Sequence, residues 1–279
     1  MPLFSRDGIE FHYREVGEGA PFVFQHGLGG DTSQPLGIFQ PPPGFRLLTM
    51  DCRGHGETRP LGDVAKISIA VFADDVVALL DHLGVRRAVV GGISMGSAVA
   101  LSLALRYPQR VLGLVLSRAA WLDGPLQSNV RIYTGLARLI RQHGARRAEE
   151  LFRESDDYRS VRRVSPDTAD SLLRQFQNPR IEETVVKMER IAVDAPCRSL
   201  KELEAIAVPT LVLAGRQDPI HPYTYGAILA RAIPGAEFRE LTPKSIDKDR
   251  HAAEVQRFVA DFLLRRLGGK NAATEPRAV

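Results

Sequence analysis

Short apolar runs alternate with longer segments of helical periodicity along most of the chain. Continuous apolar runs of this length predict buried strands. They lie at residues 21–25, 45–50, 88–90, 111–116, 210–214 and 236–241. Segments with apolar residues at helical spacing lie between or after them, at about residues 69–83, 98–105, 223–233 and 251–267. Residues 4–6 and 9–16 predict a hairpin about Asp7-Gly8. Strands that alternate with helices in this way predict an α/β domain whose mostly parallel sheet is covered on both faces.

The alternation is interrupted between residues 126 and 206. This block has no strand pattern and predicts amphipathic helices instead. They are expected at about residues 129–142, 145–154, 166–177, 180–192 and 200–206. We therefore expect a core of residues 1–125 and 207–267, a helical cap at 126–206, and a disordered polar tail at 268–279.

Composition and charge narrow the class of protein. The apolar fraction of 44% and the charged fraction of 25% are ordinary for a globular protein. The longest apolar run is too short for a transmembrane helix, and the first residues lack the apolar core of a signal peptide. These features predict a cytoplasmic protein without a membrane partner.

The net charge of +4 does not indicate a nucleic-acid partner. The densest basic group, residues 138–163, is interleaved with acidic residues, which is typical of solvated helix faces. Cys52 and Cys197 lie far apart and predict free thiols. The histidines and cysteines have no metal-ligand spacing, so neither a metal nor a cofactor is expected.

The first candidate for chemistry is Ser94, in the pentapeptide Gly92-Ile93-Ser94-Met95-Gly96. A G-x-S-x-G sequence between a buried strand and a helix is the context of a nucleophile elbow, in which a tight turn pushes the serine into a cleft. The N-terminus of the following helix offers free N–H groups, including that of Met95, to a developing oxyanion. The alternative interpretation is a glycine-rich turn with a solvated serine.

The other candidates also follow predicted strands. Asp218 follows the strand at 210–214, and His26 follows the strand at 21–25. Ligands of parallel sheets bind outside the carboxyl ends of the strands, so this placement predicts a site there. Asp218 is the preferred acid, with an Asp-Pro turn as its structural alternative and Asp123 as the fallback acid.

The order of these features resembles the α/β-hydrolase superfamily. Within it, Asp51-x-Arg53-Gly54-His55-Gly56 and Ser94-Met95-Gly96 resemble a small capped lineage. That lineage includes 3-oxoadipate enol-lactonases, C–C bond hydrolases, small esterases and cofactor-free perhydrolases. The resemblance implies an α/β-hydrolase fold with an eight-stranded, mostly parallel sheet and a helical cap insertion.

The resemblance also implies roles for individual residues. Ser94 is the expected nucleophile, and Asp218 is expected to orient a basic histidine near the carboxyl end of the chain. His221 and His251 both follow the acid, and His251 is preferred. The segment after the last strand, Thr242-Pro243-Lys244-Ser245-Ile246, has no histidine, so residues 244–250 must fold back to deliver His251. Alternatively, His251 only begins a helix.

Backbone N–H groups are expected to form the oxyanion hole. Met95 supplies one, and the resemblance implies that Leu28 supplies the other. His26, Gly27 and Trp121 are candidates for the substrate pocket, although a loop-bracing role for His26 and core packing for Trp121 are open alternatives. A phosphate-binding loop at residues 27–32 is disfavoured because the P-loop lysine is missing.

The sequence therefore predicts a serine hydrolase that acts on a small or medium carboxylic ester or lactone through an acyl-enzyme. A C–C bond hydrolase or a cofactor-free perhydrolase is the alternative within this chemistry, and a lyase or cyclase also stays open. A triad-bearing small-molecule receptor is the non-enzyme alternative. The expected partner is a small-molecule substrate, and the oligomeric state is left open.

Overall fold

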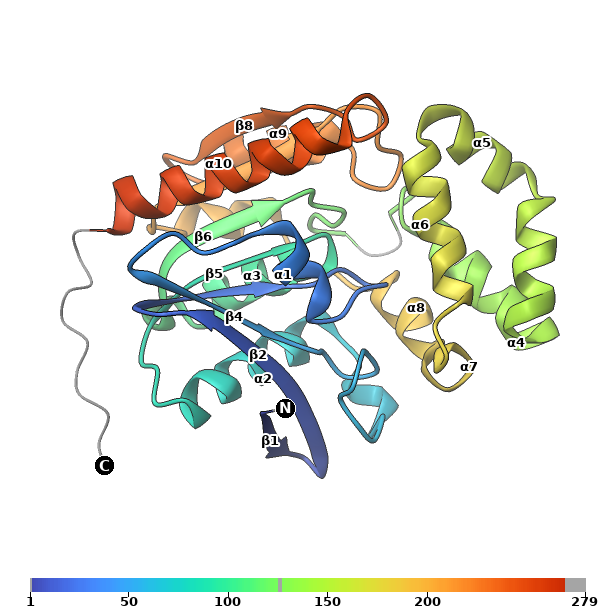
Figure 1. The fold of residues 1–279 in the computed structure, drawn as a ribbon, viewed down its shortest axis with the longest axis horizontal. Coiled ribbons are helices and arrows are strands. Elements are labelled where there is room, and N and C mark those ends of the chain that lie inside the picture. The colour runs from blue at the N-terminus through green and yellow to red at the C-terminus, as the bar shows by residue number, and fades with distance from the viewer. Residues whose placement is uncertain (1, 125–126, 269–279) are drawn as a thin grey trace.

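The apolar runs form one eight-stranded sheet in the order β1-β2-β4-β3-β5-β6-β7-β8 (Figure 1). The structure, a computed structural model, describes residues 2–124 and 127–268. The strands are β1 (Leu3–Arg6), β2 (Ile9–Gly17), β3 (Ala20–Gln25), β4 (Phe45–Met50), β5 (Ala88–Ile93), β6 (Val111–Ser117), β7 (Thr210–Gly215) and β8 (Glu237–Leu241). β2 pairs antiparallel with β1 and β4, and all other pairs are parallel. The mostly parallel α/β sheet predicted from the sequence is confirmed.

Successive residues of the central strands enter two separate hydrophobic clusters. In β3, Phe22 and Phe24 belong to one cluster and Val23 belongs to the other. Side chains alternate between the faces of a strand, so the two clusters lie on opposite faces of the sheet. Both faces are dry, which explains why the central strands are continuous apolar runs in the sequence.

Helices cover both faces. α2 (Ile69–His82), α3 (Met95–Arg106) and α9 (Tyr223–Ala232) pack on the face of Val23. α10 (Lys248–Leu267) and the short α1 (Ser33–Ile38) pack on the face of Phe22. The sequence pattern did not predict α1, because a helix of this length has too few turns to establish a period.

The segment between β6 and β7 contains only helices in its described part. They are α4 (Arg131–Arg153), α5 (Asp156–Val164), α6 (Pro166–Phe176), α7 (Ile181–Thr184), α8 (Val186–Ile191) and the 3₁₀ helix Leu200–Ala205. Two further 3₁₀ helices lie elsewhere, at Val64–Lys66 and Pro108–Arg110. Figure 1 shows α4 to α8 gathered at one end of the sheet. The predicted cap boundary at 125/126 and the predicted tail beyond residue 268 lie outside the described residues.

The helices α4 and α5 compare differently with the sequence expectation. Gly144 has φ 72° and interrupts α4, which accords with the break predicted between two helices. α5 was not predicted, because only Tyr158 and Val161 of its residues are buried and the apolar period is weak. Its start is fixed locally instead, since the Ser155 side chain accepts a hydrogen bond from the Tyr158 N–H.

Buried polar contacts join the helical segment to the loop after β4. Lys187 of α8 is 1% exposed, and its Nζ donates to the Gly54 carbonyl at 2.9 Å. Arg180 donates to the carbonyls of Gly56 and Thr58 at 3.0 and 3.1 Å. The helices are therefore fastened to the sheet domain by hydrogen bonds to loop backbone as well as by packing.

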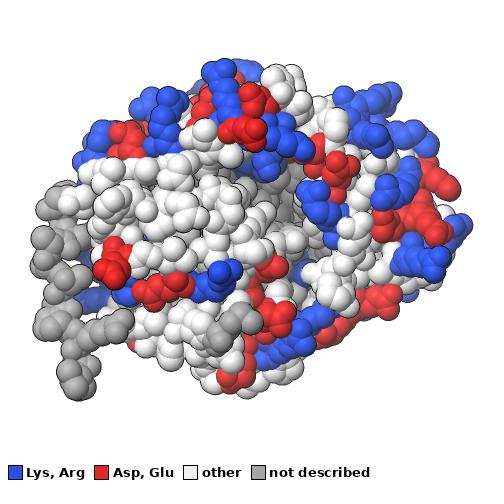
Figure 2. Space-filling model, in the orientation of Figure 1, with Lys and Arg blue, Asp and Glu red and all other residues white. Residues whose placement is uncertain are grey.

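The surface and composition of the described part give few further clues to a partner. On the face seen in Figure 2, basic and acidic side chains are interspersed. Within residues 2–124 and 127–268, no helix has the length and apolarity needed to cross a membrane. In the same ranges, no three His, Cys, Asp or Glu side chains gather into a possible metal site. Cys52 and Cys197 are free and buried.

Candidate active site

Ser94 lies at the sharp turn between β5 and α3. Its backbone has φ 57° and ψ −117°, a conformation that L residues rarely adopt. Its N–H donates to the Ser117 carbonyl at 3.0 Å, which fixes the turn to the end of β6. A Cβ on Gly92 would lie 2.2 Å from the backbone of Gly96, so only glycine permits this close approach of strand and helix. The pentapeptide therefore has the geometry of a nucleophile elbow.

Asp218 and His221 lie on one turn after β7, only three residues apart. The Oδ1 atom of Asp218 accepts hydrogen bonds from the N–H groups of Ile220 and His221, both at 3.2 Å. The Oδ2 atom accepts from Nδ1 of His221 at 2.9 Å. The carboxylate thus closes the turn and holds the imidazole at the same time.

His221 connects this turn to the elbow. Its Nε2 lies 2.9 Å from Oγ of Ser94. Because Asp218 accepts a hydrogen bond from the Nδ1–H group, the neutral imidazole carries its lone pair on Nε2, where it can accept the Ser94 proton. The structure thus brings Ser94, His221 and Asp218 together in a continuous chain of hydrogen bonds.

The structure does not bring His251 to Ser94, which corrects our preference for His251 over His221. Asp247 caps α10 by accepting a hydrogen bond from the Arg250 N–H at 2.9 Å, so the helix already begins at Lys248. His251 therefore lies in the first turns of α10, and its Nδ1 donates to the Thr242 carbonyl at 2.8 Å. Burial lowers the pKa of His251 to about 4. The helix start holds this residue beside the end of β8, as the alternative interpretation proposed.

Sequence reasoning considered His221 but missed the signal that favours it. In Asp218-Pro219-Ile220-His221-Pro222, two prolines bracket a short turn with the acid at one end and the histidine at the other. Proline fixes φ and favours such turns, which can return a side chain toward its own acid. Arg118, the first residue after β6, was also missed, although it too follows the carboxyl end of a strand.

Arg118 completes the charge distribution around the acid. Its Nε and Nη2 donate to Asp218 Oδ2 at 3.1 and 2.5 Å. Burial by itself raises the pKa of Asp218, but the charges of His221 and Arg118 outweigh it and hold that pKa well below its usual range. Burial lowers the pKa of His221, Asp218 opposes this shift, and Arg118 adds to it. At neutral pH the acid is ionised and the imidazole is neutral, as a general base requires.

The two residues expected to donate to an oxyanion, Leu28 and Met95, lie on the loop after β3 and at the start of α3. Met95 is the first residue of α3 after Ser94, and Leu28 follows Gly27. A Cβ on Gly27 would lie 3.3 Å from Cβ of Ser94, so the loop after β3 runs against Ser94. Within the described part of the chain, neither N–H group has a protein hydrogen-bond acceptor. Leu28 and Met95 therefore stay the predicted donors for an oxyanion at Ser94.

A helix of the insertion contacts the same loop. A Cβ on Gly29 would lie 1.8 Å from Nε2 of Gln175, a buried side chain of α6. The loop after β3 therefore lies between the elbow and α6. A movement of α6 at Gln175 would therefore displace the loop that carries Leu28.

The remaining candidates have structural contacts. His26 is fully buried, with Nδ1 on the Gly27 carbonyl at 2.8 Å and Nε2 accepting from the Cys52 N–H at 3.1 Å. Trp121 is 1% exposed and donates from Nε1 to the Ile191 carbonyl of α8 at 3.0 Å. Asp123, the fallback acid, accepts from the Leu200 N–H at 3.1 Å. These contacts brace loops and helices around the site.

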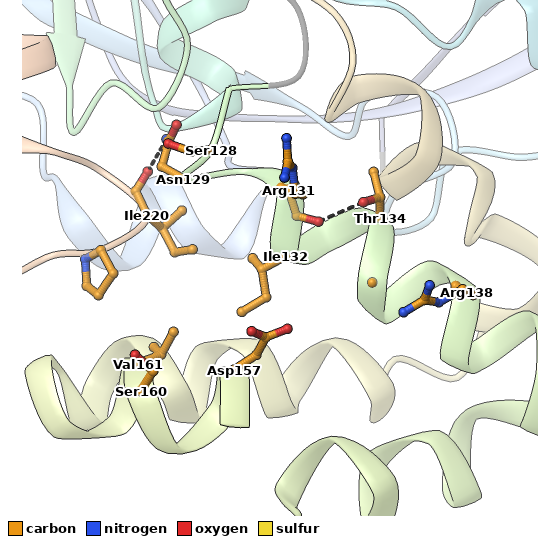
Figure 3. A pocket seen from close by; sticks show the side chains of 12 residues that line it. Ser128, Asn129, Arg131, Ile132, Thr134, Arg138, Asp157, Ser160, Val161 and Ile220 are labelled. Atoms are coloured by element: carbon orange, nitrogen blue, oxygen red, sulfur yellow. Dashed lines mark hydrogen bonds between the residues drawn. The ribbon is translucent and has the colours of Figure 1, made fainter. Parts of the chain in front are cut away.

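A groove of about 610 Å³ lies beside the acid–base turn, between α4, α5 and residues 219–220 (Figure 3). Asn129 lines it and donates to the Ile220 carbonyl at 2.7 Å, a bond drawn in Figure 3. Ser94 and His221 are not among the described residues that line this groove. The groove is therefore a neighbour of the turn and does not itself contain the serine.

The fold agrees with the comparison to known proteins. The sequence model of the alpha/beta hydrolase fold family matches residues 20–253. The chain therefore belongs to the alpha/beta hydrolase fold family.

Similar proteins include several hydrolases. The chain is 27% identical to the 2-hydroxymuconate semialdehyde hydrolase of Pseudomonas putida, over 94% of this chain and 95% of that protein. It is also 27% identical to 3-oxoadipate enol-lactonase 2 of Acinetobacter baylyi, over 84% of this chain and 87% of that one. The crystal structure of the enol-lactonase from Burkholderia xenovorans LB400 superposes with a TM-score of 0.71 at 27% identity, over 94% of this chain and 99% of that chain.

Proposed function

We propose that the protein is a serine hydrolase in which Ser94 is the nucleophile, His221 the general base and Asp218 the acid that orients it. The observation that carries this proposal is the pair of hydrogen bonds made by one imidazole. Nε2 of His221 lies 2.9 Å from Ser94 Oγ, and its Nδ1 lies 2.9 Å from Asp218 Oδ2. A serine hydroxyl is a weak nucleophile until an adjacent base removes its proton.

The reaction proceeds through an acyl-enzyme. His221 accepts the Ser94 proton while Oγ attacks the carbonyl carbon, and the N–H groups of Leu28 and Met95 stabilise the oxyanion. The tetrahedral intermediate collapses when His221 returns the proton to the leaving alkoxide oxygen. Water, deprotonated by the same imidazole, then attacks the acyl carbon and releases the carboxylic acid. With a lactone the alkoxide belongs to the acyl chain, so ring opening leaves one hydroxy acid as the product.

Small or medium carboxylic esters and lactones are the proposed substrates. The similarity to two enol-lactonases, each at 27% identity over most of the chain, supports this class. The similarity to a 2-hydroxymuconate semialdehyde hydrolase supports C–C bond hydrolysis as the second candidate. A panel of p-nitrophenyl esters, γ- and δ-lactones, and a 2-hydroxy-6-oxo-dienoate separates them, because the C–C reaction needs a carbon leaving group rather than an oxygen one.

The triad is tested with three alanine variants and a fluorophosphonate, which phosphonylates an activated serine and releases fluoride. Ser94→Ala should remove labelling, and His221→Ala should lower the labelling rate and ester turnover by about 10³-fold or more. His251→Ala, the matched histidine control, should stay within about threefold of the wild type, because its imidazole bonds to the Thr242 carbonyl.

If His251→Ala instead lost labelling and turnover while His221→Ala kept them, the base would be His251. An unlabelled wild-type protein that binds a small ester without turning it over would favour the receptor alternative. Circular dichroism of each variant establishes that the fold is retained.

A further inference from the structure

Arg118 lies against both the acid and the base of the proposed triad. Its Nη2 is 2.5 Å from Asp218 Oδ2 and 3.1 Å from His221 Nδ1, and its Nε is 3.1 Å from the same Oδ2. The side chains of Arg118, Asp218 and His221 are 13%, 12% and 10% exposed. The guanidinium and imidazole N–H groups thus converge on a single carboxylate oxygen in a site that is mostly closed to water.

The backbone of Arg118 has an unfavourable conformation that its neighbours maintain. Its φ of 47° is in the left-handed region, which is unusual for a residue with a Cβ. Its N–H donates to the Leu213 carbonyl of β7 at 2.8 Å. The preceding Ser117 accepts the N–H of Ser94 at 3.0 Å. The same strand end therefore fixes the elbow through Ser117 and the acid through Arg118.

We propose that Arg118 is a positioning residue that locks Asp218 and His221 in one arrangement and keeps the imidazole in its neutral, proton-accepting form. This inference rests on the proposed function of Ser94 and His221. A planar guanidinium presents fixed N–H donors and is always charged, so it fixes the direction of the carboxylate as well as its ionisation. The carboxylate that faces His221 is therefore already partly neutralised.

Arg118 changes the electrostatics of the base in a definite direction. Burial lowers the pKa of His221, the carboxylate of Asp218 raises it, and the charges of Arg118 and Lys244 lower it further. Two other titratable groups face the Arg118–Asp218 pair from neighbouring helices, the phenol of Tyr133 on α4 and the imidazole of His251 on α10. Burial raises the pKa of Tyr133 to about 12 and lowers that of His251 to about 4, so both are neutral near pH 7.

The test is the pH dependence of fluorophosphonate labelling of Ser94 in the full-length protein, between about pH 4 and 9. The rate falls on the acidic side when His221 becomes protonated, so a higher pKa moves this fall to higher pH. Arg118→Met removes the charge and should move the midpoint up by about one pH unit. Arg118→Gln, which keeps a donor toward Asp218, should move it equally. Arg118→Lys keeps the charge without the fork, so its midpoint should stay near the wild type while its maximal rate falls.

Arg216→Met is the matched control. Arg216 lies on the loop after β7 but pairs with Glu240 and is 61% exposed. Its profile should match the wild type. A merely structural role of Arg118 would lower the rate at every pH without moving the midpoint, so unshifted profiles of Arg118→Met and Arg118→Gln would overturn the inference.

If the proposed function is wrong, the result is different: His221→Ala is still labelled at the wild-type rate. The inference is then still tested by the imidazole ¹⁵N signals of His221, assigned by comparison with His221→Gln. These signals report the protonation of His221 without catalysis. An unchanged titration of His221 in Arg118→Gln would also refute the role of Arg118.

Discussion

At the scale of single residues, the conformation of Ser94 depends on two glycines beside it. A left-handed backbone at a serine costs on the order of 1–3 kcal/mol and persists only where the surroundings enforce it. A Cβ on Gly96 would lie 2.1 Å from the Gln25 carbonyl oxygen and 2.8 Å from that of His26. These backbone atoms belong to the last residue of β3 and the first residue of the loop after it, so they cannot move without displacing Leu28. The elbow and the proposed oxyanion loop thus share one steric constraint.

We therefore expect Gly96→Ala to lower the free energy of unfolding by about 3 kcal/mol or more, because the added methyl overpacks fixed backbone. The labelling rate of Ser94 should fall with it. Gly135→Ala is the matched control, since Gly135 lies in α4 and a Cβ there would meet nothing within 4 Å. That variant should be neutral or stabilising by up to about 1 kcal/mol. Denaturant unfolding measures both, and equal losses in the two variants would contradict the argument.

At the scale of elements, α6 packs directly against the loop after β3. Gln175 is 7% exposed and occupies the space that a Cβ on Gly29 would need. The obstructing atom is the end of a flexible side chain. A methyl group added at Gly29 would therefore displace Gln175 or the loop and leave the strands in place. The loop position, and with it the Leu28 N–H, is therefore sensitive to what α6 presents.

This contact predicts a rescue. Gly29→Ala should lower kcat/KM for a p-nitrophenyl ester by about tenfold, because a small misplacement of a catalytic donor is costly. Gln175→Ala alone should change it little, and the double variant Gly29→Ala/Gln175→Ala should recover most of the loss. The double-mutant cycle measures this coupling. If the double variant is as impaired as Gly29→Ala alone, the contact with α6 does not determine the position of the loop.

At the scale of the whole molecule, one buried lysine fastens the helical segment to the sheet domain. Lys187 is 1% exposed, donates to the Gly54 carbonyl, and has a pKa lowered by burial from 10.5 to about 8. The folded protein therefore binds fewer protons than the unfolded chain between these values. Because the unfolded chain binds more protons in this range, the free energy of unfolding rises with pH.

Lys187→Met should remove that dependence. The unfolding free energy of the wild type should increase relative to Lys187→Met between about pH 8 and 10.5, by about 3 kcal/mol at most. Lys201→Met, at an exposed lysine of the 3₁₀ helix Leu200–Ala205, should show no such divergence from the wild type. The comparison is made by denaturant unfolding at a series of pH values. Parallel curves for the wild type and Lys187→Met would contradict the linkage.

The sequence by itself determined the sheet, the longer helices α2, α3, α9 and α10 that cover it, and the elbow. Each depends on local information, namely continuous apolar runs, helical periodicity and the glycines around Ser94. It also predicted Asp218 as the acid, because a residue shortly after a buried strand lies near the carboxyl end of that strand. α1 and α5 escaped prediction because their apolar patterns are too short or too weak to exceed the background.

Only the tertiary structure decided which histidine faces Ser94. Two histidines follow the acid, and chain order alone does not measure their distance to the serine. The N-cap at Asp247 begins α10 before His251, and the imidazole of His251 bonds to the Thr242 carbonyl. The carboxylate of Asp218 instead stabilises the turn that carries His221, whose Nε2 lies 2.9 Å from Ser94 Oγ. Arg118 likewise meets Asp218 across 100 residues of sequence. A buried ionic contact depends on distance in space, which no local pattern of residues encodes.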